Sequence, residues 1–332
     1  MQRALELAQM GRYTCAPNPM VGCVIVHEDE IIGEGFHYKA GEPHAEPNAI
    51  ATVADKSLLA SSTLYVSLEP CAHFGRTPPC SNLIIEHQIP RVVLATRDFN
   101  SEVNGKGIQR MQNAGIELIE GVLEKEAQLL NAKFFTFHQK KRPFISLKWA
   151  QSKDGIMDPA REEKQKGIQW ISQPESQVYS HRLRVEHQAI LVGRKTVETD
   201  NPSLDSRAFK GPDPLRIIID PKAKLNTDLK VFRDPNYWHF KEDPKGERDR
   251  YLDSKSPLES ILNTCYNEGI QSLLVEGGAK TLSHFVEQDL WDEIHIIEAN
   301  HCLNSGLKAP SIKGAADQLI QLGKDQIKIY RQ

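Results

Sequence analysis

Hydrophobic positions in the first 140 residues switch between helical and strand periodicity. Apolar residues recur at helical spacing over positions 1–10, which predicts a helix. Two apolar runs joined by four polar residues predict a β-hairpin. Beyond it, strand-like and helix-like stretches alternate, which indicates an α/β layer with helices on both faces of a sheet. The expected strands are 22–26, 31–36, 63–68, 91–96 and 116–120, and the expected helices are 44–50, 80–85, 107–114 and 122–137.

The second half of the chain repeats this alternation after a charged stretch that ends at Pro143. A chain of 332 residues suits two domains of ordinary size, so we expect domains at 1–142 and 143–332. Expected strands are 144–150, 189–193, 215–220 and 272–276, with a helix at 280–286.

The glycine pair 277–278 separates the last of these strands from its helix. Such a turn is either a phosphate seat at a helix N-terminus or a tight turn without a ligand. No complete G-x-G-x-x-G is present, so the sequence gives no support for a Rossmann dinucleotide site.

Composition narrows the class of protein. The net charge of −3 gives no basic excess for a nucleic-acid backbone. No apolar run reaches membrane-spanning length, and the first residues lack the apolar core of a signal peptide. The six cysteines show no disulfide spacing, which favours a reducing compartment. We therefore expect a soluble cytoplasmic protein that binds neither nucleic acid nor a membrane.

The strongest chemical signal is His44-Ala45-Glu46, followed downstream by Pro70-Cys71 and Cys80. One imidazole and two thiolates supply three ligands to a tetrahedral zinc ion and leave the fourth position for water. Zinc lowers the pKa of that water, and Glu46, which is not a ligand, is close enough to relay its proton. This order of residues is the signature of zinc-dependent base deaminases.

Each part of this pattern has a simpler explanation when it stands alone. A buried histidine or cysteine is most often a packing residue, and three such ligands can also form a purely structural zinc site. The spacing is unusual as well, because eight residues separate Cys71 from Cys80 where a CxxC is common. The intervening loop must leave the site and return, and its His73 and Arg76 are placed to meet an anionic substrate.

Three segments together resemble the deaminase domain of the bifunctional riboflavin-biosynthesis deaminase/reductase family. They are Asn18-Pro19-Met20-Val21-Gly22, the HAE motif at 44–46, and the run LEPCAHFGRTPPC at 68–80. The resemblance implies zinc ligation by His44, Cys71 and Cys80 and proton transfer by Glu46. It further implies pyrimidine contact from Asn18 and substrate or phosphate contact from His73 and Arg76.

The second half resembles the reductase domain of the same family. The similar segments are 169–172, 182–184, 190–193, 196, 200–204, 207 and 276–278. That domain has a dihydrofolate-reductase-like fold and uses NADPH. The residues implied in NADPH binding are Ala150, Trp170, Thr196, Asp200, Gly278, Ala279, Lys280, Thr281 and Leu282. Those implied in substrate binding are Lys148, Ile168, Arg184, Leu204, Arg207 and Glu276.

Five positions depart from the family pattern, and Asn48 and Lys153 are two of them. Pro47 follows the HAE motif, and Phe99 stands where a proline is usual. Ile168 occupies a position where relatives often carry a serine that contacts the substrate, and its side chain cannot form a hydrogen bond. Proline is tolerated in a first helical turn, so Pro47 fits only if the helix begins close to His44.

The resemblance implies a cytidine-deaminase-like three-layer α/β/α domain followed by a dihydrofolate-reductase-like α/β domain. It implies zinc-dependent hydrolytic deamination of 2,5-diamino-6-(5-phosphoribosylamino)pyrimidin-4(3H)-one. NADPH-dependent reduction of the ribosyl group of 5-amino-6-(5-phosphoribosylamino)uracil to ribityl then follows. The family favours homo-oligomers, dimeric or larger. Two alternatives stay open from the residues: a deaminase with an inactive C-terminal domain, and a non-enzymatic, zinc-stabilised nucleotide-binding module.

Overall fold

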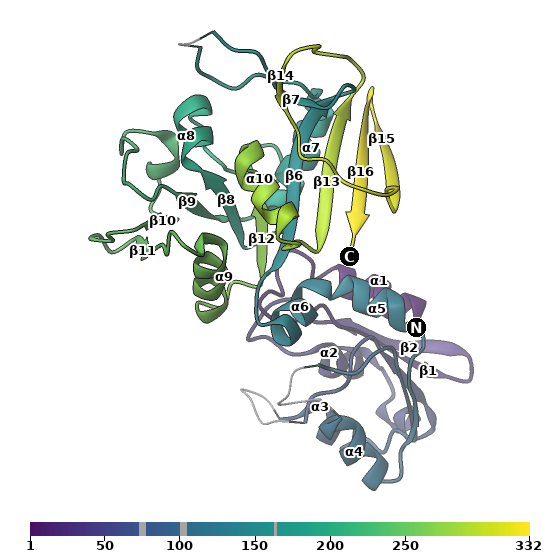
Figure 1. Cartoon of the computed structure of the whole chain (residues 1–332). Helices are drawn as coiled ribbons and strands as arrows, with labels where there is room; N and C mark the ends of the chain where they lie inside the picture. Colours follow the sequence, from purple (N-terminus) through teal and green to yellow (C-terminus); the bar gives the residue numbers. More distant parts are fainter. Residues whose placement is uncertain (73–77, 100–104, 163–164) are drawn as a thin grey trace. The chain divides into compact units, whose positions relative to one another are not determined.

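The computed structural model describes residues 1–72, 78–99, 105–162 and 165–332. The chain forms two compact units, Met1–Lys141 and Arg142–Gln332 (Figure 1). Each unit is built on a sheet of its own, with five strands in the first unit and nine in the second.

The sheet of the first unit has the order β2-β1-β3-β4-β5. A β-hairpin supplies its antiparallel edge, and β1 also pairs antiparallel with β3, whereas β3, β4 and β5 run parallel. The strands are β1 (Gly22–His27), β2 (Glu30–Phe36), β3 (Thr63–Val66), β4 (Arg91–Leu94) and β5 (Glu117–Ile119).

Helices cover both faces of this sheet because its strands carry apolar side chains on both sides. On one face, Ala49, Ile84 and Met111 belong to a single buried cluster. They come from the helices α2 (Ala45–Thr52), α3 (Cys80–Glu86) and α4 (Lys106–Asn113). The other face is covered by α1 (Gln2–Gln9), whose Ala4 and Leu7 pack against Val24.

The expected single helix at 122–137 is wrong in one respect. The structure contains two helices there, α5 (Glu124–Leu130) and α6 (Ala132–Lys140). They are separated at Asn131, whose amide exchanges two hydrogen bonds of 2.8 Å with the backbone of Met20. These long-range hydrogen bonds stabilise the interruption between α5 and α6, which the local apolar pattern does not predict. The first three residues of the charged stretch, 138–140, form the end of α6. The first compact unit ends at Lys141.

The second unit contains a mostly parallel sheet with the order β11-β10-β9-β8-β12-β6-β13-β16-β15. The first seven strands in this order run parallel, and β16 and β15 complete one side as antiparallel strands. The strands are β6 (Phe144–Ser152), β8 (Ala189–Gly193), β9 (Leu215–Ile219), β10 (Tyr237–Lys241), β11 (Asp249–Tyr251), β12 (Ser272–Val275), β13 (Glu293–Ala299), β15 (Gln318–Leu322) and β16 (Asp325–Arg331). A separate pair joins β7 (Ile156–Pro159) to β14 (Gly306–Lys308).

The alternation of side chains along β8 shows how this sheet is covered. Ala189 and Leu191 belong to one buried cluster, and Ile190 and Val192 belong to another. The first cluster includes residues of α9 (Pro257–Asn267) and α10 (Ala279–Glu287). The second includes residues of α7 (Pro174–Val185) and α8 (Arg194–Asp200). The sheet is therefore the middle of three layers.

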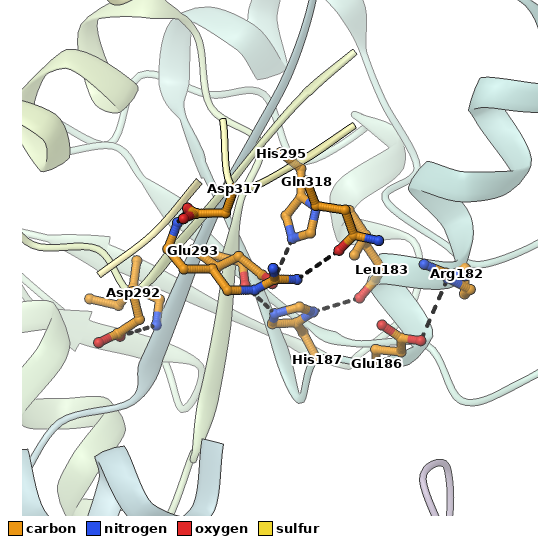
Figure 2. A network of polar contacts seen from close by, with 12 residues as sticks. Arg182, Leu183, Glu186, His187, Asp292, Glu293, His295, Asp317 and Gln318 are labelled. Carbon is orange, nitrogen blue, oxygen red and sulfur yellow. Dashed lines mark hydrogen bonds and ion pairs between the residues drawn. The ribbon is translucent and has the colours of Figure 1, made fainter. Parts of the chain in front are cut away.

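Helix α7 is fixed to the sheet by buried polar contacts (Figure 2). His187, just after the helix, contacts Leu183 O through Nδ1 at 2.7 Å and Ser146 Oγ through Nε2 at 2.8 Å. His295 on β13 contacts Glu293 through Nε2 and Tyr179 Oη through Nδ1, both at 2.8 Å. Because a carbonyl and a carboxylate only accept, His187 carries a proton on Nδ1 and His295 carries one on Nε2. These contacts set the position of α7 relative to β6 and β13.

In the described part of the chain, none of the helices has the length and apolar character needed to cross a membrane.

Candidate active sites

The predicted metal ligands of the first unit come together. His44 Nδ1 lies 3.6 Å from Cys71 Sγ and 3.4 Å from Cys80 Sγ. Ligand atoms of a tetrahedral zinc with bonds of about 2.0 Å to nitrogen and about 2.3 Å to sulfur lie roughly 3.5 Å apart. All three ligand atoms lie within 4.8 Å of one another. The donor set and its spacing therefore fit a zinc ion with three protein ligands.

Two helix starts place these ligands. His44 is the N-cap of α2, which puts Glu46 and Pro47 in the first turn of the helix, where proline is tolerated. Cys80 is the first residue of α3, and its backbone N–H donates to Cys71 Sγ over 3.3 Å. The expectation that α2 begins close to His44 is confirmed.

Glu46 is buried beside the ligands, with 3% of its surface exposed. Burial, reinforced by the negative charge of Cys71, raises the pKa of the Glu46 carboxyl to about 7 in the metal-free protein. The thiol of Cys80 and the ring of His44 donate hydrogen bonds that lower the pKa of Cys71, so a thiolate forms readily there. A carboxyl group that titrates near neutrality is suited to accept and return a proton.

The carboxylate of Glu69, a residue to which the sequence analysis gave no role, connects the segment before Cys71 with the start of α4. This buried carboxylate accepts backbone N–H groups from Asp98, Gly105, Gly107 and Ile108 at 3.0–3.4 Å. A Cβ atom at Gly107 would lie 2.0 Å from Pro70 O, so only glycine allows this close approach. The start of α4 is thereby held against the residue that precedes Cys71.

The side chain of Asn18 contacts the ring of His37, which in turn packs against the ring of His44. Asn18 Nδ2 lies 3.0 Å from His37 Nε2, and His37 Nδ1 lies 3.1 Å from Pro43 O. The carbonyl can only accept, so His37 carries its proton on Nδ1 and Nε2 accepts from the Asn18 amide. The His37 ring also meets the His44 ring edge to face, with centroids 5.3 Å apart. The predicted contacts at His73 and Arg76 lie outside the described residues.

A second candidate site is a cavity of about 190 Å³ in the second unit. It contains ten of the residues that the sequence assigned to NADPH or substrate. From the NADPH set they are Ala150, Trp170, Thr196 and Asp200, and from the substrate set Lys148, Ile168, Arg184, Leu204, Arg207 and Glu276. These residues come from segments almost 130 positions apart, which the parallel sheet gathers at the carboxyl ends of β6, β8 and β12.

Three charged side chains of this cavity form a buried group. Arg184 donates to both carboxylate oxygens of Glu276, at 3.1 and 2.7 Å, and to Asp205 O at 2.8 Å. Lys148 Nζ lies 3.9 Å from Glu276 Oε2. Burial alone would raise the pKa of Glu276, but Arg184 and Lys148 lower it to about 2. Burial lowers the pKa of Lys148. With Glu276 ionised and both bases protonated, the group carries one net positive charge, which suits an anionic ligand.

The glycine turn after β12 lies close to the start of α8. A Cβ atom at Gly278 would lie 3.0 Å from Thr196 Oγ1, and one at Gly193 would lie 2.7 Å from Thr281 Oγ1. Glycine at both positions lets the two turns approach each other, with the N-termini of α8 and α10 side by side. Of the predicted run 278–282, the side chain of Leu282 is fully buried in the core.

Sequence reasoning missed several residues of the cavity. They include Gln169, Ser172, Gln177, Ser180, His181 and Ser203. The helical spacing of Gln177, Ser180, His181 and Arg184 on α7 is the signal that was available, because side chains three and four apart share a face.

In the first unit, Phe99, a departure from the family pattern, packs edge to face on Phe135 with ring centroids 5.0 Å apart.

Two family models match this chain. Residues 1–96 match the cytidine and deoxycytidylate deaminase zinc-binding region, and residues 143–314 match the RibD C-terminal domain.

Full-length relatives agree with these matches. The riboflavin biosynthesis protein RibD of Aquifex aeolicus is 38% identical and covers 100% of this chain and 97% of its own length. RibD of Escherichia coli is 34% identical, with 96% and 92% covered.

Solved structures show the same fold. The diaminohydroxyphosphoribosylaminopyrimidine deaminase/5-amino-6-(5-phosphoribosylamino)uracil reductase of Thermotoga maritima is 37% identical, with a TM-score of 0.88 over 100% of this chain and 97% of that one. Acinetobacter baumannii RibD gives a TM-score of 0.88 at 34% identity, with 99% and 97% covered. The chain therefore belongs to the RibD family of riboflavin biosynthesis, whose members combine a zinc-binding deaminase domain with an NADPH-dependent reductase domain.

Proposed function

We propose that the first unit deaminates 2,5-diamino-6-(5-phosphoribosylamino)pyrimidin-4(3H)-one at the site around His44. The observation that supports this proposal most directly is the spacing of His44 Nδ1, Cys71 Sγ and Cys80 Sγ, which suits one tetrahedral zinc ion. When bound, zinc acts as a Lewis acid that makes a water molecule reactive near neutral pH.

The residues of this chain then have separate roles. Glu46 accepts one proton from the attacking water and passes it to the ring nitrogen, and it then moves the second proton of that water to the leaving amine. Asn18, oriented by His37, contacts the pyrimidine. We assign substrate or phosphate contact to His73 and Arg76.

In the second unit, we infer reduction of the ribosyl group of 5-amino-6-(5-phosphoribosylamino)uracil to ribityl. NADPH supplies the hydride when bound. Ala150, Trp170, Thr196, Asp200 and the run 278–282 are assigned to the cofactor, and Gly278 lies close to Thr196. Lys148, Ile168, Arg184, Leu204, Arg207 and Glu276 are assigned to the substrate. The net positive charge of the group Lys148–Arg184–Glu276 suits the phosphate.

One experiment tests both assignments. The purified full-length chain is incubated with the diaminopyrimidine ribosyl phosphate, with and without NADPH, and ammonia and NADPH are measured separately. We expect ammonia in both reactions and loss of NADPH only after ammonia has formed. Ammonia without NADPH loss would support the alternative of a deaminase with an inactive second unit, and absence of ammonia would contradict the first assignment.

We further propose that the protein acts in the cytoplasm as a homo-oligomer, dimeric or larger. The family resemblance and the absence of disulfide spacing in the sequence support this proposal. Light scattering coupled to size-exclusion chromatography tests the oligomeric state, and a monomer at micromolar concentration would contradict it.

A further inference from the structure

His181 lines the cavity of the second unit together with Arg184 and Arg207. It stands on α7 one turn before Arg184, so the two side chains share a face of the helix. It is 4% exposed. None of the roles assigned above involves this ring.

The hydrogen bond that His181 makes fixes which nitrogen carries the proton. The backbone N–H of Ala208, the residue after Arg207, donates to His181 Nδ1 over 3.3 Å. Because that N–H can only donate, Nδ1 holds the lone pair and the proton of the neutral ring is on Nε2. Within the described part of the chain, no residue accepts the Nε2 proton.

The surroundings keep this ring neutral. Burial, followed by the positive charges of Arg184 and Arg207, lowers the pKa of His181 to about 4. Above that pH the ring presents one N–H group close to Arg184 and Arg207, whose positive charges are partly balanced by Glu276 and Asp205.

Arg184 alone does not supply enough free N–H groups for a phosphate. Arg184 has five N–H groups, and three of them are engaged with Glu276 and Asp205. A phosphate has three terminal oxygens, each of which accepts more than one hydrogen bond, so the two remaining N–H groups of Arg184 do not satisfy it by themselves, and Arg207 is the other arginine assigned to the substrate.

We propose that His181 is a substrate-specificity residue whose Nε2–H donates to the phosphate of the reductase substrate. This inference rests on the proposed assignment of Arg184 and Arg207 to that substrate, with its phosphate near the charged group that contains Arg184. The ring has two separate tasks, because Nδ1 holds the segment after Arg207 and Nε2 meets the ligand.

Two substitutions separate these tasks. In His181→Asn the side-chain oxygen takes the place of Nδ1 and can still accept the Ala208 N–H, but the donor at Nε2 is lost. In His181→Gln a donor is retained near Nε2, but the acceptor for Ala208 is lost. We expect His181→Asn to raise the KM for the phosphorylated substrate roughly tenfold to a hundredfold, with kcat and the KM for NADPH nearly unchanged. His181→Gln should retain most of the wild-type KM.

The same measurements include their controls. With the substrate lacking its phosphate, wild type and His181→Asn should have the same kcat/KM, and inorganic phosphate should inhibit His181→Asn at least tenfold more weakly than wild type. Ammonia release by the first unit reports folding of the same chain, and Val178→Ala, on the exposed side of α7, reports effects on the helix.

Two results would contradict the proposed role of His181, and a third would contradict the proposed function of the second unit. An equal loss on substrates with and without phosphate would show that His181 does not bind phosphate. A larger loss in His181→Gln than in His181→Asn would assign the ring a structural role only. A wild-type chain that oxidises no NADPH with the phosphorylated substrate would instead contradict the proposed function of the second unit.

Discussion

The surroundings of Glu46 change the acidity of its carboxyl group. It is buried beside three metal ligands, and its carboxylate has the negative charge of Cys71 nearby. Both effects disfavour the ionised form in the metal-free protein. The sequence motif predicted the role of this residue, but only the packing of α2 determines how far its pKa moves.

Replacing Glu46 by Gln should remove proton transfer without disturbing the metal ligands. General acid–base catalysis of this kind contributes about a hundredfold to ten-thousandfold, so we expect ammonia release to fall by at least that factor. Zinc content, measured by atomic emission, should stay at one ion per chain. Wild-type turnover in Glu46→Gln would contradict the proposed role, and NADPH oxidation with a deaminated substrate serves as the control for folding.

The same residue should make the stability of the zinc-free protein depend on pH. The pKa of Glu46 is about 7 when folded and near 4.5 when unfolded, so the folded state keeps a proton that the unfolded state releases. The resulting stabilisation is complete below about pH 4.5 and is lost as the pH rises through about 7. Relative to Glu46→Gln, the unfolding free energy of the first unit should fall by about 3 kcal/mol over this range. Urea titrations at pH 5 and pH 8 measure the difference, and parallel curves for the two proteins would contradict it.

At the scale of elements, the contact between β2 and α2 determines where His44 and Glu46 lie. A Cβ atom at Gly35 would lie 2.3 Å from Ala49 N and 2.6 Å from Ala45 O. These are backbone atoms of the helix that follows His44, so they can move only if the helix moves. Glycine in β2 is thus a requirement of the metal site as well as of the fold.

Gly35→Ala should therefore weaken the first active site. We expect a cost of about 1–3 kcal/mol in stability from overpacking, lower zinc affinity and slower ammonia release. Ile31→Ala, at an exposed position of the same strand, is the matched control and should leave both properties unchanged. Zinc titration with a chromogenic chelator measures the affinity, and equal values for Gly35→Ala and wild type would refute the requirement.

On the scale of the whole molecule, the two sites use separate cores and separate chemistry. Residues 1–141 and 142–332 each form a compact unit with a sheet of its own. The metal ligands all belong to the first unit, and the cavity assigned to NADPH and substrate belongs to the second.

Removal of zinc should therefore separate the two activities. Treatment with a strong chelator is expected to abolish ammonia release, while NADPH oxidation with 5-amino-6-(5-phosphoribosylamino)uracil continues at the untreated rate. Added zinc should restore deamination. Loss of both activities on chelation, with circular dichroism unchanged, would show that the reductase depends on the metal and would contradict this division.

The sequence by itself was sufficient to predict the candidate metal ligands that the structure brings together, the two-domain α/β architecture and most of the residues assigned to the cavity. It did so because ligand types at specific spacings, and apolar periodicities, are local properties of the chain. The tertiary structure alone decided the pairing of Arg184 with Glu276, the tautomer of His181, and the break at Asn131. Each of these depends on a hydrogen-bond or charge partner far away in the chain, and no local pattern specifies which partner the fold will bring near.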